Sequence, residues 1–225
     1  MNGQGDAVDR DSSGNRERFR ALVDVSRETL EALDRYEYLL RRWQGSINLV
    51  GKTTLSEVWT RHFLDSLQIA DLVPRARTFM DLGSGAGFPG LVIAIRLKER
   101  GIGRITLIDS SAKKTAFLTK VQQTLELPAE VVTGRLEQWL PRLPVPEIVT
   151  ARALAPLTQL LDWCEPLLKS GSRALFLKGR NLDNELSEAA QYWEIDFVRH
   201  AHALEAESWI LEVRSARRRT PPSGT

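Results

Sequence analysis

The sequence contains a single cysteine, Cys164, in 225 residues. One thiol cannot form an internal disulfide or supply the cysteine cluster of a structural metal site. We therefore predict no metal centre and expect a reducing compartment, the cytoplasm. Long apolar runs are also missing, and no stretch approaches the roughly 20 apolar residues of a membrane span. The first 18 residues are polar and lack the apolar segment of a secretory signal.

A marked excess of one charge is absent as well, because the formal net charge is only +2. This balance gives no bulk electrostatic argument for a nucleic-acid partner. The distribution is less even: residues 96–120 hold seven basic and two acidic side chains, and residues 214–219 read RSARRR. Solvated helix faces and a surface for a polyanion both produce such clusters, so both interpretations stay open.

The composition and the spacing of apolar residues divide the chain into four segments. Residues 1–15 are rich in Gly, Ser and Asp, and we predict disorder there. Residues 16–73 show apolar side chains at helical spacing and predict a helical extension. Residues 74–215 alternate five strand-like runs with helix-like segments and then add two strand-like runs without a helix between them. This order predicts an α/β fold with a seven-stranded, mostly parallel sheet and an antiparallel edge hairpin. Residues 216–225 form a basic tail that we expect to be flexible.

The segment MDLGSGAGFPG, residues 80–90, lies where the first predicted strand of this sheet turns into a helix. Clustered glycines indicate a backbone that passes close to a ligand at a helix amino end. Gly85 and Gly87 with Gly90 also fit a dinucleotide fingerprint. Asp81 separates the two interpretations, because a carboxylate there repels a pyrophosphate and attracts an ammonium or sulfonium group. The pattern D-x-G-x-G-x-G is similar to the S-adenosylmethionine motif of Rossmann-like class I methyltransferases.

Asp109 ends the second predicted strand, where a carboxylate can accept hydrogen bonds from both ribose hydroxyls. Its alternative role is to cap the helix that starts near Ala112. The fourth strand ends in TARALAP, with Arg152 where amine methyltransferases carry a proline-rich motif. Cys164 follows in an apolar helix, which favours a core position over a nucleophile. Guanine N7 has a free lone pair and needs no general base, so the lack of an obvious base is compatible with that acceptor.

Several motifs in one order resemble the RsmG (GidB) family of bacterial small-subunit ribosomal RNA guanine-N7 methyltransferases. They are W-x4-NL, RHFLDSL, DLGSGAGFPGLVIAI, LIDSSAKKTAFL, GRLEQ, TARALAPL and LFLKG, and they span residues 43–179. The resemblance implies an S-adenosylmethionine-dependent enzyme that methylates N7 of a guanine in 16S ribosomal RNA or the small ribosomal subunit. It also implies a cytoplasmic protein, for which we expect a monomer. Two alternatives stay open: a methyltransferase of the same fold for a small molecule or protein, and a non-catalytic RNA-binding assembly factor.

The resemblance also implies cofactor contacts in the glycine turn and after the third and fourth strands. With the carboxylates argued above, the predicted cofactor residues are Asp81, Gly83, Gly85, Phe88, Asp109, Leu136, Glu137 and Arg152. Arg152 is also a candidate for an electrostatic role in catalysis. No residue is predicted to form a covalent intermediate.

Four further residues in family-like motifs are predicted to border the acceptor pocket: Asn48, His62, Asp65 and Lys178. Each has a structural alternative, which is a turn cap for Asn48, a surface pair for His62 with Asp65, and a strand-end cation for Lys178. Residues 1–75 hold eleven basic and twelve acidic side chains. We therefore predict RNA phosphate contacts elsewhere, in residues 96–120, Arg173, Lys178, Arg180 and the arginine tail.

Overall fold

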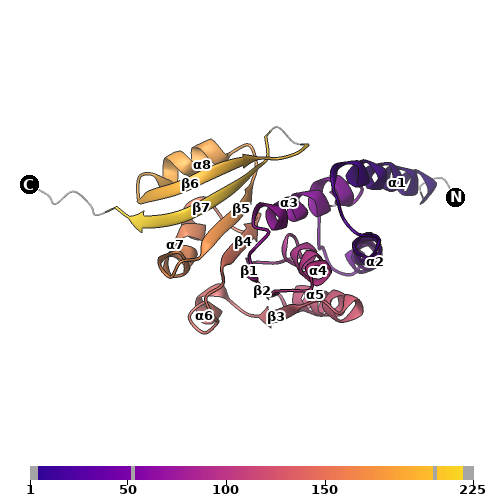
Figure 1. The fold of residues 1–225 in the computed structure, drawn as a ribbon, viewed down its shortest axis with the longest axis horizontal. Helices are drawn as coiled ribbons and strands as arrows, with labels where there is room; N and C mark the ends of the chain where they lie inside the picture. The colour runs from indigo at the N-terminus through magenta and orange to yellow at the C-terminus, as the bar shows by residue number, and fades with distance from the viewer. Residues whose placement is uncertain (1–4, 52–53, 205–206, 220–225) are drawn as a thin grey trace, which may run out of the picture.

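The structure is a computed structural model, and it describes residues 5–51, 54–204 and 207–219. Four helical segments come first: α1 (Gly5–Leu22), α2 (Arg27–Gln44), a π-helical turn η2 (Val58–Phe63) and α3 (Leu64–Leu72). Strands and helices then alternate (Figure 1): β1 (Thr78–Leu82), α4 (Gly90–Arg100), β2 (Arg104–Asp109), α5 (Ala112–Leu125), β3 (Ala129–Thr133), α6 (Leu136–Trp139), β4 (Ile148–Arg152), α7 (Leu157–Lys169), β5 (Arg173–Lys178), α8 (Leu182–Ala189), β6 (Trp193–Ala201) and β7 (Trp209–Arg218).

The seven strands form one sheet in the order β3-β2-β1-β4-β5-β7-β6. Strands β1 to β5 are parallel, and β7 runs antiparallel to both β5 and β6. The predicted sheet and its antiparallel edge hairpin are therefore confirmed. Because the strand order reverses between β1 and β4, a crevice is expected at the carboxyl ends of these two strands.

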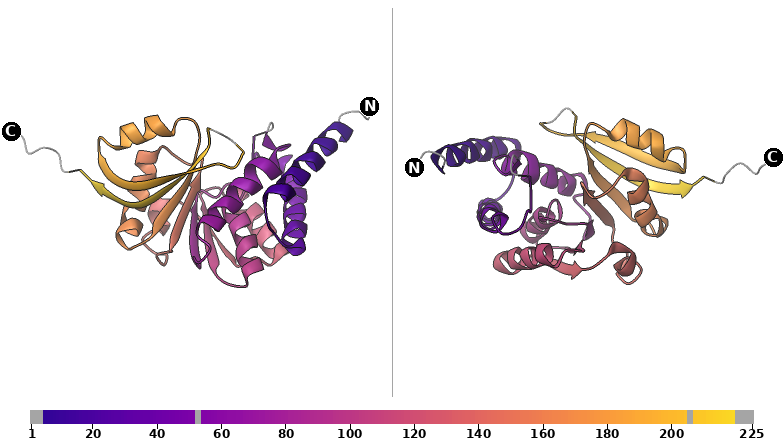
Figure 2. Two further views of the ribbon diagram at one scale, coloured as in Figure 1. Left: turned by 45° about the horizontal axis from the view of Figure 1, so that its top comes forward. Right: turned by 180° about the vertical axis from the view of Figure 1, so that it is seen from behind.

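Helices cover both faces of the sheet (Figure 2), and each face has its own apolar core. On one face, α4 and α5 share a core with the N-terminal helices, in which Phe19 meets Trp59 edge-on and Tyr36 stacks on Phe88. On the other face, α7 and α8 pack on a core that includes Cys164, which is fully buried as predicted. Burial raises the pKa of the Cys164 thiol to about 12, which suits a packing role.

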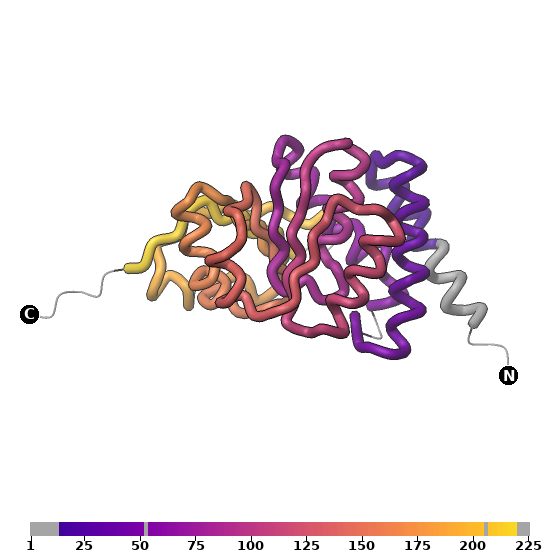
Figure 3. The backbone as a smooth tube through the Cα atoms, turned by 90° about the horizontal axis from the view of Figure 1, so that it is seen from below, coloured from indigo at the N-terminus to yellow at the C-terminus, as the bar shows by residue number. Residues whose placement is uncertain are grey.

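The N-terminal helices lie at one end of the molecule and the β6–β7 hairpin at the other (Figure 3). Helix α2 begins at the N-cap Ser26, whose hydroxyl accepts from Thr29 N–H. Its buried side includes Leu33, Tyr36 and Leu40, and these side chains face the sheet core. The helical extension is therefore packed into the same core as the sheet.

Two predicted boundaries differ from the structure. The stretch 1–15 was predicted to be disordered, but α1 starts at Gly5; residues 1–4 lie outside the described residues. Arg16 holds Asp34 through two hydrogen bonds of 2.7 Å, and Phe19 is buried, so distant contacts anchor a helix that local composition disfavours. At the other end, residues 216–218 continue β7 because they pair with β6, and residues 220–225 are not described.

None of the helices within the described ranges is long and apolar enough to cross a membrane.

Candidate cofactor and acceptor sites

The glycine segment forms a turn between β1 and α4, as predicted for a strand-to-helix ligand loop. Gly83, Gly85 and Gly87 have φ angles of +64°, +57° and +95°, which side chains rarely adopt. A Cβ on Gly83 would lie 2.4 Å from Leu154 Cδ1, so glycine is needed there for space as well. The Tyr36 hydroxyl of α2 donates to Ala86 O at 2.5 Å and ties this turn to the N-terminal helices.

Asp81 lies beneath the turn and is fully buried. Its Oδ1 accepts from the Thr150 hydroxyl at 2.7 Å, and its Oδ2 lies beside Gly90, where an added Cβ would stand 2.7 Å away. Burial raises the pKa of Asp81 to about 7, against the hydrogen bonds that favour its charged form. This carboxylate can therefore act on a bound cation through its field from below the turn.

One pocket of about 310 Å³ opens at the carboxyl ends of β1, β2 and β3. Four predicted cofactor residues line it, namely Gly83, Asp109, Leu136 and Glu137. We call it the cofactor-side pocket. Its position beside the strand reversal is the place where nucleotide ligands bind in open α/β sheets.

Asp109 is held in this pocket by two backbone donors, with Oδ2 accepting from Gly85 N–H and Oδ1 from Ser111 N–H, both at 2.8 Å. The N-cap of α5 is Ser111, whose hydroxyl accepts from Lys114 N–H, so the helix-cap alternative for Asp109 is wrong. A carboxylate has about four acceptor positions, which leaves capacity for ribose hydroxyls.

Leu136 and Glu137 contribute differently to the cofactor-side pocket. Leu136 is the first residue of α6, so its backbone N–H has no partner inside the helix, while its side chain lies in the core. Glu137 is exposed, and its carboxylate accepts from the Trp163 indole N–H at 3.0 Å. The indole fixes the carboxylate at the rim, where it can accept from an exocyclic amine.

Four predicted cofactor residues do not line this pocket: the buried Asp81, described above, and Gly85, Phe88 and Arg152. Gly85 shapes the turn through its N–H bond to Asp109. Phe88 points into the core between Tyr36, Phe63 and His62, so its side chain faces away from the cofactor-side pocket. Arg152 lines a second pocket instead. The reason is its pairing: Arg152 Nη1 lies 3.1 Å from Asp65 Oδ2 and donates to Arg61 O at 3.3 Å.

This second pocket, of about 400 Å³, brings together three of the four predicted acceptor residues, His62, Asp65 and Lys178, with Arg152. We call it the acceptor-side pocket. Ala153, with a φ of +49°, follows β4 and lines both pockets. The two pockets are therefore neighbours at the carboxyl edge of the sheet.

His62 lies in the π-helical turn η2, an irregularity that is frequent at functional sites. Its imidazole stacks on Phe88 with a centroid distance of 4.7 Å and an interplanar angle of 18°. The residue is only 7% exposed, and neither ring nitrogen has a hydrogen-bond partner among the described residues. Burial, with help from Arg152 and Arg61, lowers the pKa of His62 to about 2, so the imidazole is neutral.

The other acceptor-side residues are paired. Lys178 Nζ lies 2.6 Å from Glu185 Oε2 and donates to Ala155 O, so this largely buried lysine is more than an exposed strand-end cation. Asp65 is buried against Arg152 and His202, not exposed in a surface pair with His62. His202 is a site residue that the sequence did not indicate, because its contact to Asp65 spans 137 positions of the chain.

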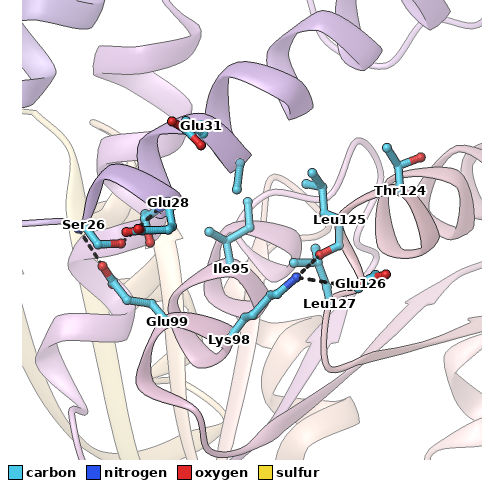
Figure 4. A pocket seen from close by; sticks show the side chains of 12 residues that line it. Ser26, Glu28, Glu31, Ile95, Lys98, Glu99, Thr124, Leu125, Glu126 and Leu127 are labelled. Carbon is cyan, nitrogen blue, oxygen red and sulfur yellow. Dashed lines mark hydrogen bonds and ion pairs between the residues drawn. The ribbon is translucent and has the colours of Figure 1, made fainter.

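Asn48 is the one predicted acceptor residue that does not line the acceptor-side pocket. It is exposed in the loop after α2 and lines neither pocket. A larger pocket of about 690 Å³ (Figure 4) also lies elsewhere, between the start of α2 and the ends of α4 and α5. Helices α4 and α5 run away from the carboxyl edge of the sheet, so this pocket is on the opposite edge, and none of the predicted site residues lines it.

A seven-stranded sheet with a reversed edge hairpin and a ligand turn after β1 defines a Rossmann-like methyltransferase fold. Consistent with this fold, an O-methyltransferase structure from Bacillus cereus in complex with SAH superposes with a TM-score of 0.57 at 13% identity, covering 92% of this chain and 99% of that one. The family model described as GidB, rRNA small subunit methyltransferase G, matches residues 29–210. The chain belongs to this family.

Individual relatives carry the same description. "Ribosomal RNA small subunit methyltransferase G" of Methylobacterium radiotolerans is 52% identical over 184 residues, which are 82% of this chain and 87% of the relative. The protein of that name from Rhodopseudomonas palustris is 42% identical over 220 residues, covering 97% of this chain and 94% of the relative. The second alignment therefore extends over nearly the whole chain.

Proposed function

We propose that this protein transfers a methyl group from S-adenosylmethionine to N7 of a guanine in 16S ribosomal RNA of the small ribosomal subunit. Family membership supports the reaction class and the RNA substrate. One observation supports the roles given to the two pockets: they are neighbours that share Ala153. Four predicted cofactor residues line one pocket, and polar acceptor candidates line the other.

In the cofactor-side pocket, Asp109 would accept from the ribose hydroxyls, while Leu136 N–H and the Glu137 carboxylate would contact the adenine. Gly83 and Gly85 would bring the turn backbone close to the methionine part, with Phe88 supporting that turn from the core. Asp81 would favour the positive charges of the donor from beneath the turn, because opposite charges attract strongly where water is excluded.

In the acceptor-side pocket, the neutral His62 imidazole would supply one donor and one acceptor to the base. Its two unpartnered nitrogens support this role, since buried polar groups without partners are costly and a ligand would satisfy them. Arg152, Asp65 and Lys178 would line the side of the pocket that faces the acceptor nucleotide. Asn48 would contact RNA outside the pocket, from its exposed loop.

The chemistry needs alignment more than acid–base help. The N7 lone pair attacks the methyl carbon, a C–N bond forms, and the C–S bond breaks with its electron pair staying on sulfur. The products are neutral S-adenosylhomocysteine and a cationic 7-methylguanosine, and no proton is removed. The enzyme contributes by holding N7 in line with the sulfonium. The carboxylate of Asp65 would offset the charge that develops on the base.

The RNA would be held by cations near the pockets. Among the described residues, the half-buried Lys114 and the exposed Arg135 line the cofactor-side pocket, the exposed Lys113 precedes Lys114, and none of the three makes an ion pair. Arg96 and Arg100, which were also predicted to contact RNA, instead pair with Asp71 of α3. We place the protein in the cytoplasm as a monomer that acts on ribosomal RNA or on a ribosomal particle.

A transfer assay with S-adenosylmethionine labelled in its methyl group tests the proposal. The acceptors offered are small subunits from cells lacking this gene, naked 16S RNA, or a pool of small metabolites and proteins. We expect label in RNA, released on digestion as 7-methylguanosine. Label in small molecules or protein would favour the alternative acceptor. RNA binding without transfer to any of these acceptors would favour the non-catalytic assembly factor.

A further inference from the structure

Two described residues between β6 and β7, His202 and Ser208, lie beside the acceptor-side pocket. The His202 side chain is fully buried there, although it lies in an irregular segment after β6. Its backbone N–H donates to Ser208 O at 3.2 Å, and Ser208 lines the acceptor-side pocket. Ser208 therefore lines that pocket, and His202 lies behind the lining, in contact with Ser208 and with Asp65.

The hydrogen bonds of His202 fix its tautomer. Leu204 N–H donates to His202 Nδ1 at 3.1 Å, so Nδ1 carries no proton in this arrangement. The proton is then on Nε2, which donates to Asp65 Oδ1 in a short contact. A neutral imidazole with this tautomer is a fixed donor aimed at one oxygen of Asp65.

Asp65 is held by both of its oxygens. While Oδ1 accepts from His202, Oδ2 lies 3.1 Å from Arg152 Nη1, and Arg152 also donates to Arg61 O. The carboxylate is buried, so losing the His202 donor would leave one oxygen unsatisfied and free to rotate toward the guanidinium. His202, Asp65 and Arg152 form a chain of contacts from the hairpin turn to the pocket wall.

We propose that His202 is a positioning residue for methyl transfer, which sets the orientation of Asp65 and, through it, of Arg152 in the acceptor-side pocket. This inference rests on the proposed function of that pocket. Small displacements of positioned groups lower rates by up to about 100-fold, so the effect falls on kcat. The cofactor-side pocket does not include His202, and cofactor affinity is unaffected.

The test compares His202→Leu, which removes the donor, with His202→Gln, whose amide NH₂ can replace Nε2–H. His200→Leu is the matched control, because His200 contacts a carboxylate, Glu212, from the same hairpin but lines neither pocket. We expect a 10- to 100-fold lower kcat on small subunits for His202→Leu. The Gln variant recovers to within about threefold of wild type, and His200→Leu equals wild type. The dissociation constant for S-adenosylmethionine, measured by calorimetry, stays the same in all four proteins.

A folded His202→Leu with wild-type kcat overturns the positioning role, as does a Gln variant as slow as the Leu variant. If His202→Leu lacks a cooperative melting transition, His202→Asn replaces it, because the shorter Asn amide cannot reach Asp65. Equal kcat values for the Asn and Gln variants then contradict the inference. The wild-type reaction in the same assay separates the two proposals. No transfer by the wild type overturns the proposed function, whereas transfer at the same rate by wild type and His202→Leu overturns only this inference.

Discussion

Asp81 lies directly beneath the glycine turn, with its carboxyl group fully buried. Its position in D-x-G-x-G-x-G suggested direct contact with a cationic cofactor, but the side chain is buried beside Thr150 and Gly90. Its pKa of about 7, raised mainly by burial, places the carboxyl group close to half-protonated at neutral pH before a ligand binds. A cation above the turn would favour the ionised form.

This gives a prediction for proton release. In the folded protein Asp81 keeps its proton to about pH 7, whereas in the unfolded chain it ionises near 3.8. The stability that Asp81 contributes is therefore greatest at low pH and is lost as the pH rises through 7. Binding a cationic cofactor at pH 7 should release roughly half a proton, and at pH 8.5 almost none.

Calorimetry in phosphate and Tris buffers measures that release, because the two buffers differ in ionisation enthalpy. Asp81→Asn should remove the buffer dependence and weaken cofactor binding. An Asp81→Asn protein that releases the same number of protons would show that another group is responsible.

Gly83 has no room for a side chain, and a matched glycine elsewhere allows this to be tested. Gly83→Ala places a methyl group 2.4 Å from Leu154 at a φ of +64°, whereas Gly101→Ala at +67° meets nothing within 4 Å. Both variants bear the backbone strain of about 1–2 kcal/mol, but only Gly83→Ala also distorts the cofactor-side pocket. We expect at least tenfold weaker S-adenosylmethionine binding for Gly83→Ala in titration calorimetry and unchanged binding for Gly101→Ala. Equal affinities would contradict the role given to the turn.

Among the secondary-structure elements, α2 connects the helical extension to the cofactor site. The buried Tyr36 hydroxyl donates to Ala86 O inside the glycine turn, and its ring stacks on Phe88. The extension therefore contributes to the cofactor site through a single buried hydrogen bond and the aromatic packing around it.

Removing the hydrogen bond from Tyr36 to Ala86 tests whether α2 supports the glycine turn. Tyr36→Phe leaves the buried Ala86 carbonyl without its partner, which costs about 1–3 kcal/mol of unfolding free energy. Urea denaturation should show this loss, and cofactor affinity should fall with it. Tyr38→Phe is the control, since Tyr38 is about half exposed on the same helix and should change neither quantity. Wild-type cofactor affinity in a destabilised Tyr36→Phe would mean that the extension does not support the turn.

The elements themselves could be predicted where the signal is local. Alternating strand and helix patterns gave the sheet, and the glycines after β1 marked the ligand turn. Contacts between distant segments left no such signal. The helix from Gly5, the inward direction of Phe88 and the pairing of Arg152 with Asp65 depend on packing across the fold, and so does His202. The π-helical turn that presents His62 interrupts what sequence spacing describes as an ordinary helix.

The distribution of charge belongs to the whole molecule. Arg135 lines the cofactor-side pocket and makes no ion pair with the described residues, whereas the exposed Lys98 lines the pocket on the opposite edge of the sheet. Phosphate contacts make RNA affinity fall steeply with salt. We expect the KM for small subunits to rise about tenfold or more between 50 and 200 mM salt, with little change in the KM for S-adenosylmethionine.

Charge-reversal variants show which edge of the sheet contacts the RNA. Arg135→Glu should raise the KM for small subunits and reduce its salt dependence, while Lys98→Glu should behave as wild type in the same steady-state assay. If Lys98→Glu is the variant that weakens RNA binding, the RNA lies on the opposite edge of the sheet.

We propose that the two neighbouring pockets together support guanine-N7 methylation of 16S ribosomal RNA. Mapping 7-methylguanosine in this RNA tests the proposal in cells with the gene, without it, and without it but carrying the gene on a plasmid. We expect one modified guanine that disappears with the gene and returns with the plasmid. An unchanged 7-methylguanosine pattern in all three strains would contradict it.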